Sequence, residues 1–193
     1  MGAGVTSMTK YSVILADPAW QYTSRSVTPN RMVINHYPTM STDSICQLPV
    51  SEMAAKECAL FMWATWPLLP DAMRVIEAWG FEYKTLAWVW VKAKENGFGF
   101  HWGMGSYTRS NSEPCFLAFR GKPMAVSDHS IQSVIYSPVM EHSRKPEDQY
   151  RKIQSLYPEG PYLELFARRP RPGWHVWGNE VVSDVEMFQN GTL

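Results

Sequence analysis

Cysteine is scarce in this chain, and the three that occur, Cys46, Cys58 and Cys115, are widely spaced. They form no Cys-x-x-Cys pair, which argues against a zinc ribbon or a dithiol redox motif. We therefore predict no metal site and expect reduced, mostly buried thiols in a cytosolic protein.

Long apolar runs are also missing. The longest, CALFMWATWPLLP at 58–70, is too short to span a bilayer and is broken by prolines. The N-terminal MGAGVTSMTK has no hydrophobic signal core. We therefore expect a cytoplasmic protein without a membrane partner.

An excess of charge of either sign is absent, because 18 basic residues balance 18 acidic ones. This argues against a protein whose whole surface attracts nucleic acid, but it is compatible with a local basic groove. The glycine-rich stretch GFGFHWGMG does not match a Gly-x-Gly-x-x-Gly dinucleotide fingerprint. No Gly-x-Ser-x-Gly is present, so a hydrolase nucleophile elbow is also excluded.

The chain does contain a large apolar fraction, 45% of 193 residues, which is enough for one compact domain over 1–193 with short flexible termini. Aromatic residues make up 13%. Several adjoin glycine or proline in expected loops, where aromatic rings can stack on a nucleobase. These are Trp20, Tyr22, Trp102, Tyr107 and Trp174.

Short apolar runs alternate with amphipathic segments along the chain. Strands are predicted at 11–16, 58–65, 82–93, 113–121, 133–138, 161–167 and within 173–179. Helices are predicted at 67–80, at 145–158 and after a capping signal at 41–43, with long loops at 21–40 and 92–112. The alternation predicts an α/β fold with a doubly wound, mainly parallel sheet, which binds ligands at the carboxyl ends of its strands.

The segment DPAW, at the end of the first predicted strand, brings together a carboxylate, a rigid proline and a large aromatic ring. Taken alone, these four residues favour an ordinary turn. As a site, Asp17 and the carbonyl of Pro18 could each accept an N–H from the amino group of a flat base, while Trp20 stacks on its face.

This set of contacts suits adenine N6, whose lone pair is delocalised into the ring, so that the nitrogen is a poor nucleophile. Two acceptors aimed at the amino hydrogens favour a pyramidal nitrogen with a free lone pair. A nearby carboxylate also stabilises the positive charge that develops as nitrogen attacks a methyl sulfonium.

The segment ADPAWQY resembles the DPPW signature of the MT-A70 (DPPW-type) family of adenine-N6 methyltransferases, in its bacterial and phage DNA branch. Three further segments are similar to family motifs and occur in family order: GMGSYTRSNSEPCFLAFRG, EHSRKPEDQY and ELFARRPRPGWHVWGNE. Together the matches cover about 11–180. The resemblance implies a Rossmann-like, class I methyltransferase fold with S-adenosyl-L-methionine as cofactor.

The resemblance also implies roles for individual residues. The catalytic set is Asp17, Pro18 and Trp20. The substrate-binding set is Tyr22, Arg109, Glu113, Arg25 and Arg31. The cofactor-binding set is Asp17, Lys145, Arg168, Asn179, Glu180 and His142, with Lys145 at the cofactor carboxylate and Arg168, Asn179 and Glu180 at the ribose.

This chain departs from the family pattern at Ala19, where the second proline of the motif is replaced, and in RPRPG after Arg168. Ordinary structural readings also stay open: Lys145 and His142 as solvated residues, Glu113 as a strand-edge residue and Glu164 as a structural one. The contact with the cofactor adenine is left unassigned.

The expected substrate is DNA with a flipped-out or single-stranded adenine. The alternatives are RNA and a non-catalytic nucleic-acid-binding subunit; Asp17 and Trp20 argue against the latter. Related families that modify cytosine N4 or glutamine usually place Asn or Ser at position 17. The predicted groove has few cations, including Lys92, Lys94, Arg169 and Arg171, so weak, salt-sensitive binding and a homodimer are expected.

Overall fold

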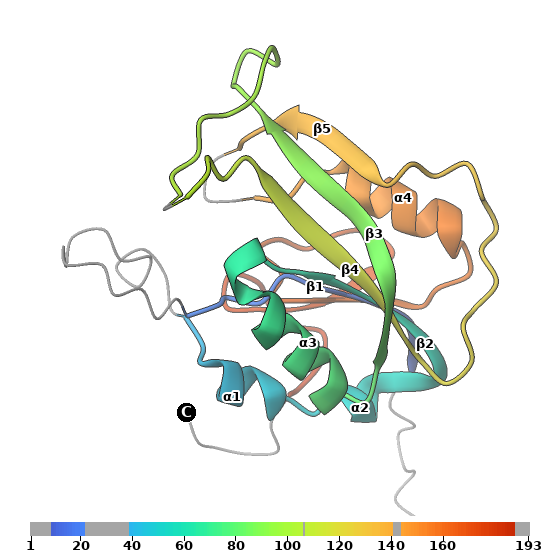
Figure 1. Ribbon diagram of the computed structural model, residues 1–193. Helices are drawn as coiled ribbons and strands as arrows, with labels where there is room; N and C mark the ends of the chain where they lie inside the picture. Colours follow the sequence, from blue (N-terminus) through green and yellow to red (C-terminus); the bar gives the residue numbers. More distant parts are fainter. Residues whose placement is uncertain (1–8, 22–38, 106, 141–143, 188–193) are drawn as a thin grey trace, which may run out of the picture.

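The computed structural model describes residues 9–21, 39–105, 107–140 and 144–187. In this part of the chain, a seven-stranded sheet has the order β5-β3-β4-β2-β1-β6-β7 (Figure 1). Its strands are β1 (Tyr11–Ala16), β2 (Ala54–Trp63), β3 (Glu82–Ala93), β4 (Ser112–Arg120), β5 (Val134–Pro138), β6 (Tyr162–Leu165) and β7 (Trp174–Trp177). The helices are α1 (Thr42–Cys46), α2 (Val50–Met53), the 3₁₀ turn η3 (Trp66–Leu68), α3 (Leu69–Ala78) and α4 (Asp148–Leu156).

The sheet is mainly parallel, as predicted. Strand β1 pairs in parallel with β2 and β6, β6 with β7, and β3 with β5. Strand β4 is the exception, because it runs antiparallel to both β2 and β3. Its first residues therefore lie at the same edge as the last residues of the parallel strands, with Glu113 opposite Trp90 and Cys115 opposite Trp63.

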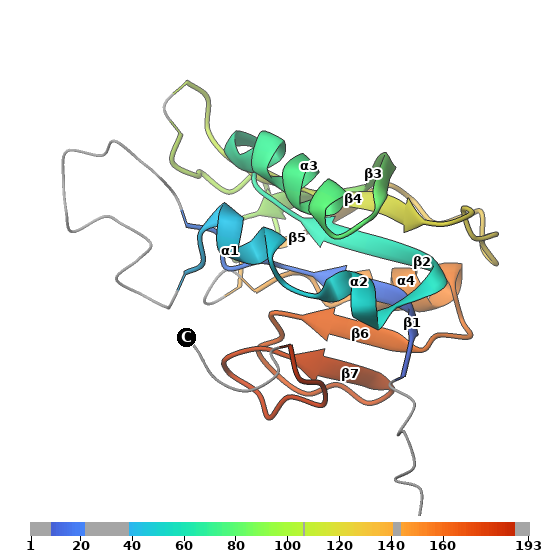
Figure 2. The ribbon, with the colours of Figure 1, turned by 90° about the horizontal axis from the view of Figure 1, so that it is seen from below.

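Alternate residues of the central strands face two different cores, which is the expected result of a period of two. Ile14 and Leu60 belong to the core that α1, α2 and α3 cover. Leu15 and Phe61 belong to the opposite core, which contains Ile153 of α4. Helices thus cover both faces of the sheet, confirming the doubly wound arrangement (Figure 2).

The sequence predicted β1 and β3 with the observed bounds. Strand β2 begins at Ala54, earlier than predicted. The prediction missed its first residues because the polar Lys56 and Glu57 interrupt the apolar pattern. Helix α1 has the predicted cap, since the hydroxyl oxygen of Ser41 accepts the backbone N–H of Ser44 at 3.1 Å.

Two local predictions were wrong. The helix expected from 145 begins at Asp148, so Lys145 lies in the segment before α4 rather than at its start. Trp174, expected as a loop aromatic, lies in β7 and is buried, stacked on Tyr162 with 4.7 Å between ring centroids. Cys58 and Cys115 are buried and all three thiols are free, as expected.

Candidate active site

A cavity of about 770 Å³ opens where β1 and β6 end, at the edge of the sheet where ligands were expected. Its size is typical of small-molecule sites. Four residues predicted to bind the cofactor line it: Asp17, Lys145, Arg168 and Glu180. Asp17 thus faces a space wide enough for a purine and is not packed among apolar side chains.

The cavity wall carries charges of both signs in nearly equal number. The acidic lining residues are Asp17, Glu95, Glu147, Glu164 and Glu180, and the basic ones are Arg144, Lys145, Arg168 and Arg169. This mixture suits a ligand that carries an ammonium group, a carboxylate and sugar hydroxyls, as S-adenosyl-L-methionine does.

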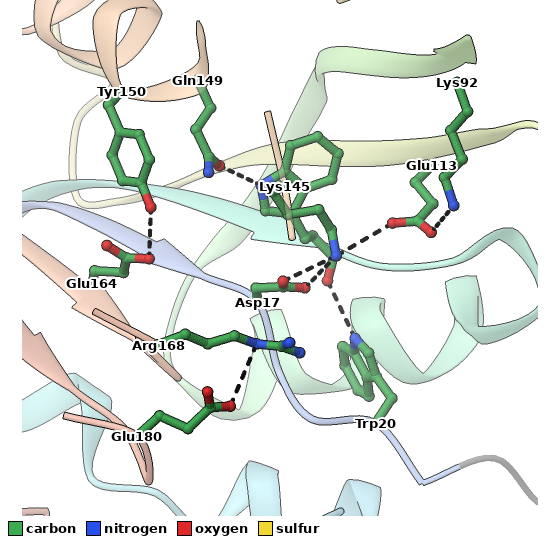
Figure 3. A network of polar contacts seen from close by, with 11 residues as sticks. Asp17, Trp20, Lys92, Glu113, Lys145, Gln149, Tyr150, Glu164, Arg168 and Glu180 are labelled. Carbon is green, nitrogen blue, oxygen red and sulfur yellow. Dashed lines mark hydrogen bonds and ion pairs between the residues drawn. The ribbon is translucent and has the colours of Figure 1, made fainter. Parts of the chain in front are cut away.

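Lys145 joins the two predicted acidic residues Asp17 and Glu113 (Figure 3). Its Nζ lies 2.9 Å from the Asp17 carboxylate and 3.3 Å from Glu113 Oε2. Lys92 donates a further hydrogen bond to Glu113 Oε1. Asp17 follows β1, Glu113 is the second residue of β4 and Lys145 precedes α4, so three distant segments meet at one ammonium group.

The two buried partners stabilise each other's charge. Burial alone would lower the pKa of the Lys145 ammonium, but Asp17 and Glu113 outweigh it and raise that pKa above its usual value. Burial alone would raise the pKa of the Glu113 carboxyl, but Lys145 and Lys92 outweigh it and lower that pKa. Both groups are therefore charged at neutral pH. Contact between Lys145 and the cofactor carboxylate stays a prediction, and it competes with these ion pairs.

Glu164, read from sequence as a structural residue, lines the cavity from β6. The hydroxyl of Tyr150 on α4 donates to its Oε1 at 2.8 Å. Because Glu164 pairs with Leu15 across β1 and β6, it lies directly beside the strand that ends just before Asp17. A lone acid in the apolar strand YLEL was the sequence signal for this position.

Burial raises the pKa of the Glu164 carboxyl to about 7, although the Tyr150 hydrogen bond favours the ionised form. A carboxyl with a raised folded-state pKa stabilises the fold below its ordinary pKa of 4.5, and this contribution is lost as pH rises through about 7. Between these values the free energy of unfolding should fall by up to about 1.4 kcal/mol per pH unit through this group.

We expect Glu164→Gln to remove that slope, because glutamine does not titrate. Urea unfolding of the wild type and the variant across this pH range measures the difference between the two profiles. Glu82→Gln, at an exposed position of β3, is the matched control. If the unfolding free energies of the wild type and Glu164→Gln depend on pH in the same way, the raised pKa of Glu164 is contradicted.

Trp20 lies deeper than its predicted stacking role requires. Its side chain is 6% exposed, belongs to the core beneath α1 and α3, and donates its indole N–H to the Trp63 carbonyl at 3.3 Å. The carbonyl of Pro18 accepts the backbone N–H of Trp20 at 2.8 Å, which leaves it one further lone pair. In this structure Trp20 packs in the core next to the segment that follows β1, and it does not line the cavity.

The remaining predicted residues have different placements. Arg168 lies 3.8 Å from Glu180, and both line the cavity, whereas Asn179 is exposed and does not line it. Arg109 is exposed on the loop between β3 and β4, 5.0 Å above the ring of Trp102. Tyr22, Arg25, Arg31 and His142 lie outside the described residues.

Three arginines surround Glu147 at the cavity wall, an arrangement that sequence reasoning missed. Arg144 lies 2.8 Å from its carboxylate, and Arg169 and Arg171 contact the same group. The Arg171 guanidinium also lies 3.4 Å from the ring centroid of Tyr150. The cluster brings together residues before α4 and after β6, so sequence spacing gave no signal for it.

Comparisons with known proteins identify the family of this chain. The sequence profile of the MT-A70 family matches residues 11–180. The chain is 32% identical over 189 residues to the type II methyltransferase M.MunI of Mycoplasma sp., covering 89% of this chain and 78% of that protein. It is 31% identical to the N(6)-adenine-specific methyltransferase METTL4 of Homo sapiens, covering 89% of this chain but only 38% of METTL4.

A third relative is the catalytic subunit METTL3 of the human N(6)-adenosine-methyltransferase, at 26% identity over 180 residues. This chain spans 29% of METTL3. The match over 11–180 contains every element of the sheet, the cavity and the four segments whose motifs suggested the family. The chain therefore belongs to the MT-A70 family, whose methyltransferases use S-adenosyl-L-methionine.

Proposed function

We propose that this protein transfers a methyl group from S-adenosyl-L-methionine to the N6 amino group of adenine in DNA. The observation that carries the proposal is the Asp17 carboxylate, which lines a cavity wide enough for a purine and is held there by Lys145. The cofactor supplies an electrophilic methyl group on a sulfonium centre.

Asp17 would accept a hydrogen bond from the N6 amino group, and the free lone pair of the Pro18 carbonyl would accept a second. Held in this way, the nitrogen would be oriented to accept the methyl group, with the demethylated cofactor as the leaving group. The Asp17 charge stabilises the positive charge that develops on nitrogen, which is preorganised electrostatic catalysis. The methylated nitrogen is acidic and loses its proton afterwards, so Asp17 need not be a strong base.

The proposed cofactor contacts are those at the cavity wall. Asp17 suits the ammonium group of the methionine moiety, and Arg168 and Glu180 suit the ribose hydroxyls, with Asn179 at the margin. Lys145 fixes the Asp17 carboxylate and keeps the Glu113 carboxylate ionised beside it. Tyr22, Arg25, Arg31 and His142 stay as sequence-based proposals for the substrate and cofactor contacts.

Two observations favour DNA over RNA. The match to the Mycoplasma type II methyltransferase covers 78% of that protein at 32% identity, whereas the matches to METTL4 and METTL3 cover 38% and 29% of those proteins. Its motif details also resemble the compact bacterial and phage members. Duplex DNA buries N6 in the base stack, so the enzyme must extrude the adenine or act on single strands.

The test is labelled-methyl transfer to matched DNA and RNA oligonucleotides, single-stranded and duplex, followed by nucleoside analysis. We expect N6-methyldeoxyadenosine from DNA and no product from oligonucleotides in which every adenine is already N6-methylated. Faster methylation of RNA than of DNA would identify RNA as the substrate. Cofactor binding without transfer to any oligonucleotide would favour a non-catalytic subunit.

A homodimer is a further part of the proposal, because a second copy would double the few cations available to a polyanion. Sedimentation with and without duplex DNA tests it. A single monomeric species under both conditions would contradict it.

A further inference from the structure

The loop that joins β3 to β4, residues 94–111, carries an unusual set of exposed aromatic side chains. We call it the aromatic loop. Phe98 is 82% exposed, Trp102 is 71% exposed and Tyr107 is fully exposed, with Phe100 also on the surface. Figure 1 shows the loop projecting beyond the ends of its two strands. Exposed apolar groups gathered in this way mark interaction sites.

The base of the loop is tied to the sheet by backbone hydrogen bonds. Lys94 N–H donates to the Gly99 carbonyl at 3.0 Å, and His101 N–H donates to the Lys92 carbonyl at 2.8 Å. The Tyr136 hydroxyl of β5 donates to the Gly99 carbonyl at 3.2 Å. Phe100 packs edge-on against Tyr136. Phe98 is therefore exposed although its segment is held by hydrogen bonds.

The two arms of the loop approach so closely that only glycine fits between them. A Cβ atom at Gly103 would lie 1.8 Å from the Ser110 carbonyl oxygen, and one at Gly105 would lie 2.0 Å from that of Thr108. A side chain at either glycine would therefore collide with the facing backbone. The rings of Trp102 and Tyr107 accordingly lie on the outside of the hairpin, available to a ligand.

The charge of the loop favours a nucleic acid as that ligand. The segment 96–112 contains no acidic residue, and its Arg109 guanidinium lies 5.0 Å from the Trp102 ring centroid. Aromatic faces beside a cation are the combination that proteins use to bind unpaired bases and their phosphates. Glu95, at the start of the loop, lines the cavity, so the aromatic loop begins at the wall of the active site.

We propose that the aromatic loop binds unpaired bases next to the target adenine, by stacking on Trp102 with Arg109 at the neighbouring phosphate. The proposal rests on the proposed nucleic-acid substrate. Stacking is tolerant of base identity, because every base has a π face. The loop would thus hold an opened strand against the cavity without reading its sequence.

The test is the affinity of Trp102→Ala for a dye-labelled single-stranded DNA oligonucleotide, measured by fluorescence anisotropy without cofactor. We expect roughly 5- to 150-fold weaker binding, the range for loss of one base–aromatic stack. Tyr83→Ala is the matched control, since Tyr83 is an exposed aromatic at the opposite end of β3. The affinity of Tyr83→Ala should be within about twofold of the wild-type affinity, because a substitution at an unrelated surface site usually has a small effect.

A second oligonucleotide, with abasic sites flanking the single adenine, separates stacking from a general loss of affinity. Wild type should lose on it about what Trp102→Ala loses on the intact strand, and the variant should lose little more. If Trp102→Ala binds both oligonucleotides more weakly than wild type by the same factor, the stacking assignment is overturned. Arg109→Gln should weaken binding to both and reduce the salt slope by about one phosphate contact.

These outcomes are distinguishable from failure of the proposed function. Wild-type affinity of Trp102→Ala, together with normal DNA methylation by the wild type, would overturn the loop proposal alone. A change of sedimentation on Trp102→Ala with unaltered oligonucleotide affinity would also overturn it, and would assign the loop to contacts between copies of the chain. Absence of methyl transfer to any oligonucleotide would overturn the proposed function, while the binding comparison would still decide on the loop.

Discussion

Replacing Asp17 with asparagine should lower the rate of methyl transfer by about 10²–10³-fold, the usual cost of removing a preorganised electrostatic contact to a transition state. Asparagine has nearly the same shape and still offers one acceptor oxygen, so the substitution removes the charge and leaves the geometry. Lys145 retains Glu113 as a partner in the variant. Cofactor binding should therefore weaken far less than the chemical step.

Single-turnover transfer from labelled cofactor measures the rate, and calorimetry measures cofactor affinity. Asp43→Asn is the control, because Asp43 is a surface aspartate paired with Arg74 on α3. Undiminished turnover of Asp17→Asn would show that the Asp17 charge has no part in the reaction. Complete loss of cofactor affinity would show that the Asp17 charge acts mainly on the cofactor and not on the acceptor amine.

Replacing Lys145 with methionine should have the largest effect on the fold, about 3–5 kcal/mol of unfolding free energy, as is typical when one partner of a buried ion pair is removed. The Lys145 side chain is 11% exposed and that of Glu113 is 12% exposed. Without the ammonium, the Asp17 carboxylate loses its ion pair with Lys145, and the Glu113 carboxylate keeps its ion pair with Lys92. Methyl transfer should be lost as well, because Asp17 is no longer held in place.

Urea unfolding measures the stability change, and the double variant Lys145→Met/Glu113→Gln tests its cause. Removing the Glu113 charge should restore part of the lost stability without restoring activity. Lys84→Met, at an exposed position of β3, should unfold like the wild type. A single Lys145→Met variant as stable as the wild type would rule out the ion pairs as a stabilising element.

The ion pairs also set an acid limit for the fold. The pKa of Glu113 is lowered, so its stabilisation is present above the ordinary carboxyl value of 4.5 and is lost as pH falls through the folded-state pKa. The pKa of Lys145 is raised, so its contribution is lost only as pH rises above the ordinary lysine range. Between these limits Glu164 is the described cavity residue whose pKa is shifted to near neutrality.

The sequence predicted the strands that are defined by local pattern. The β-branched run before Asp17 and the alternating segment 82–93 gave β1 and β3 with their observed bounds. Asp17 was also placed correctly at the end of a strand, because the adjacent proline marks where that strand must stop. These features depend on neighbours in the chain, which the sequence shows directly.

Features that depend on distant contacts were not predicted. The meeting of Glu113 with Lys145 depends on β4 running against β2 and β3, which no local pattern reveals. Glu164 was read as structural because its strand neighbours are apolar, while its partner Tyr150 is on α4. Trp20 was expected beside the ligand, but the backbone after Pro18 turns its ring into the core. The direction of a side chain after a turn is a tertiary property.

The reversed direction of β4 makes the connection between β3 and β4 a hairpin, and this has a consequence for the evolution of the enzyme. The ladder between the two strands extends to the pair Val91 and Ser112, immediately beside Glu113. The loop beyond that pair can lengthen, shorten or change in sequence without shifting Glu113, because the strand pairing holds it in place. The sheet edge that carries Glu113 can therefore stay constant during evolution, while the part of the loop beyond the cavity-lining Glu95 changes to suit a new target.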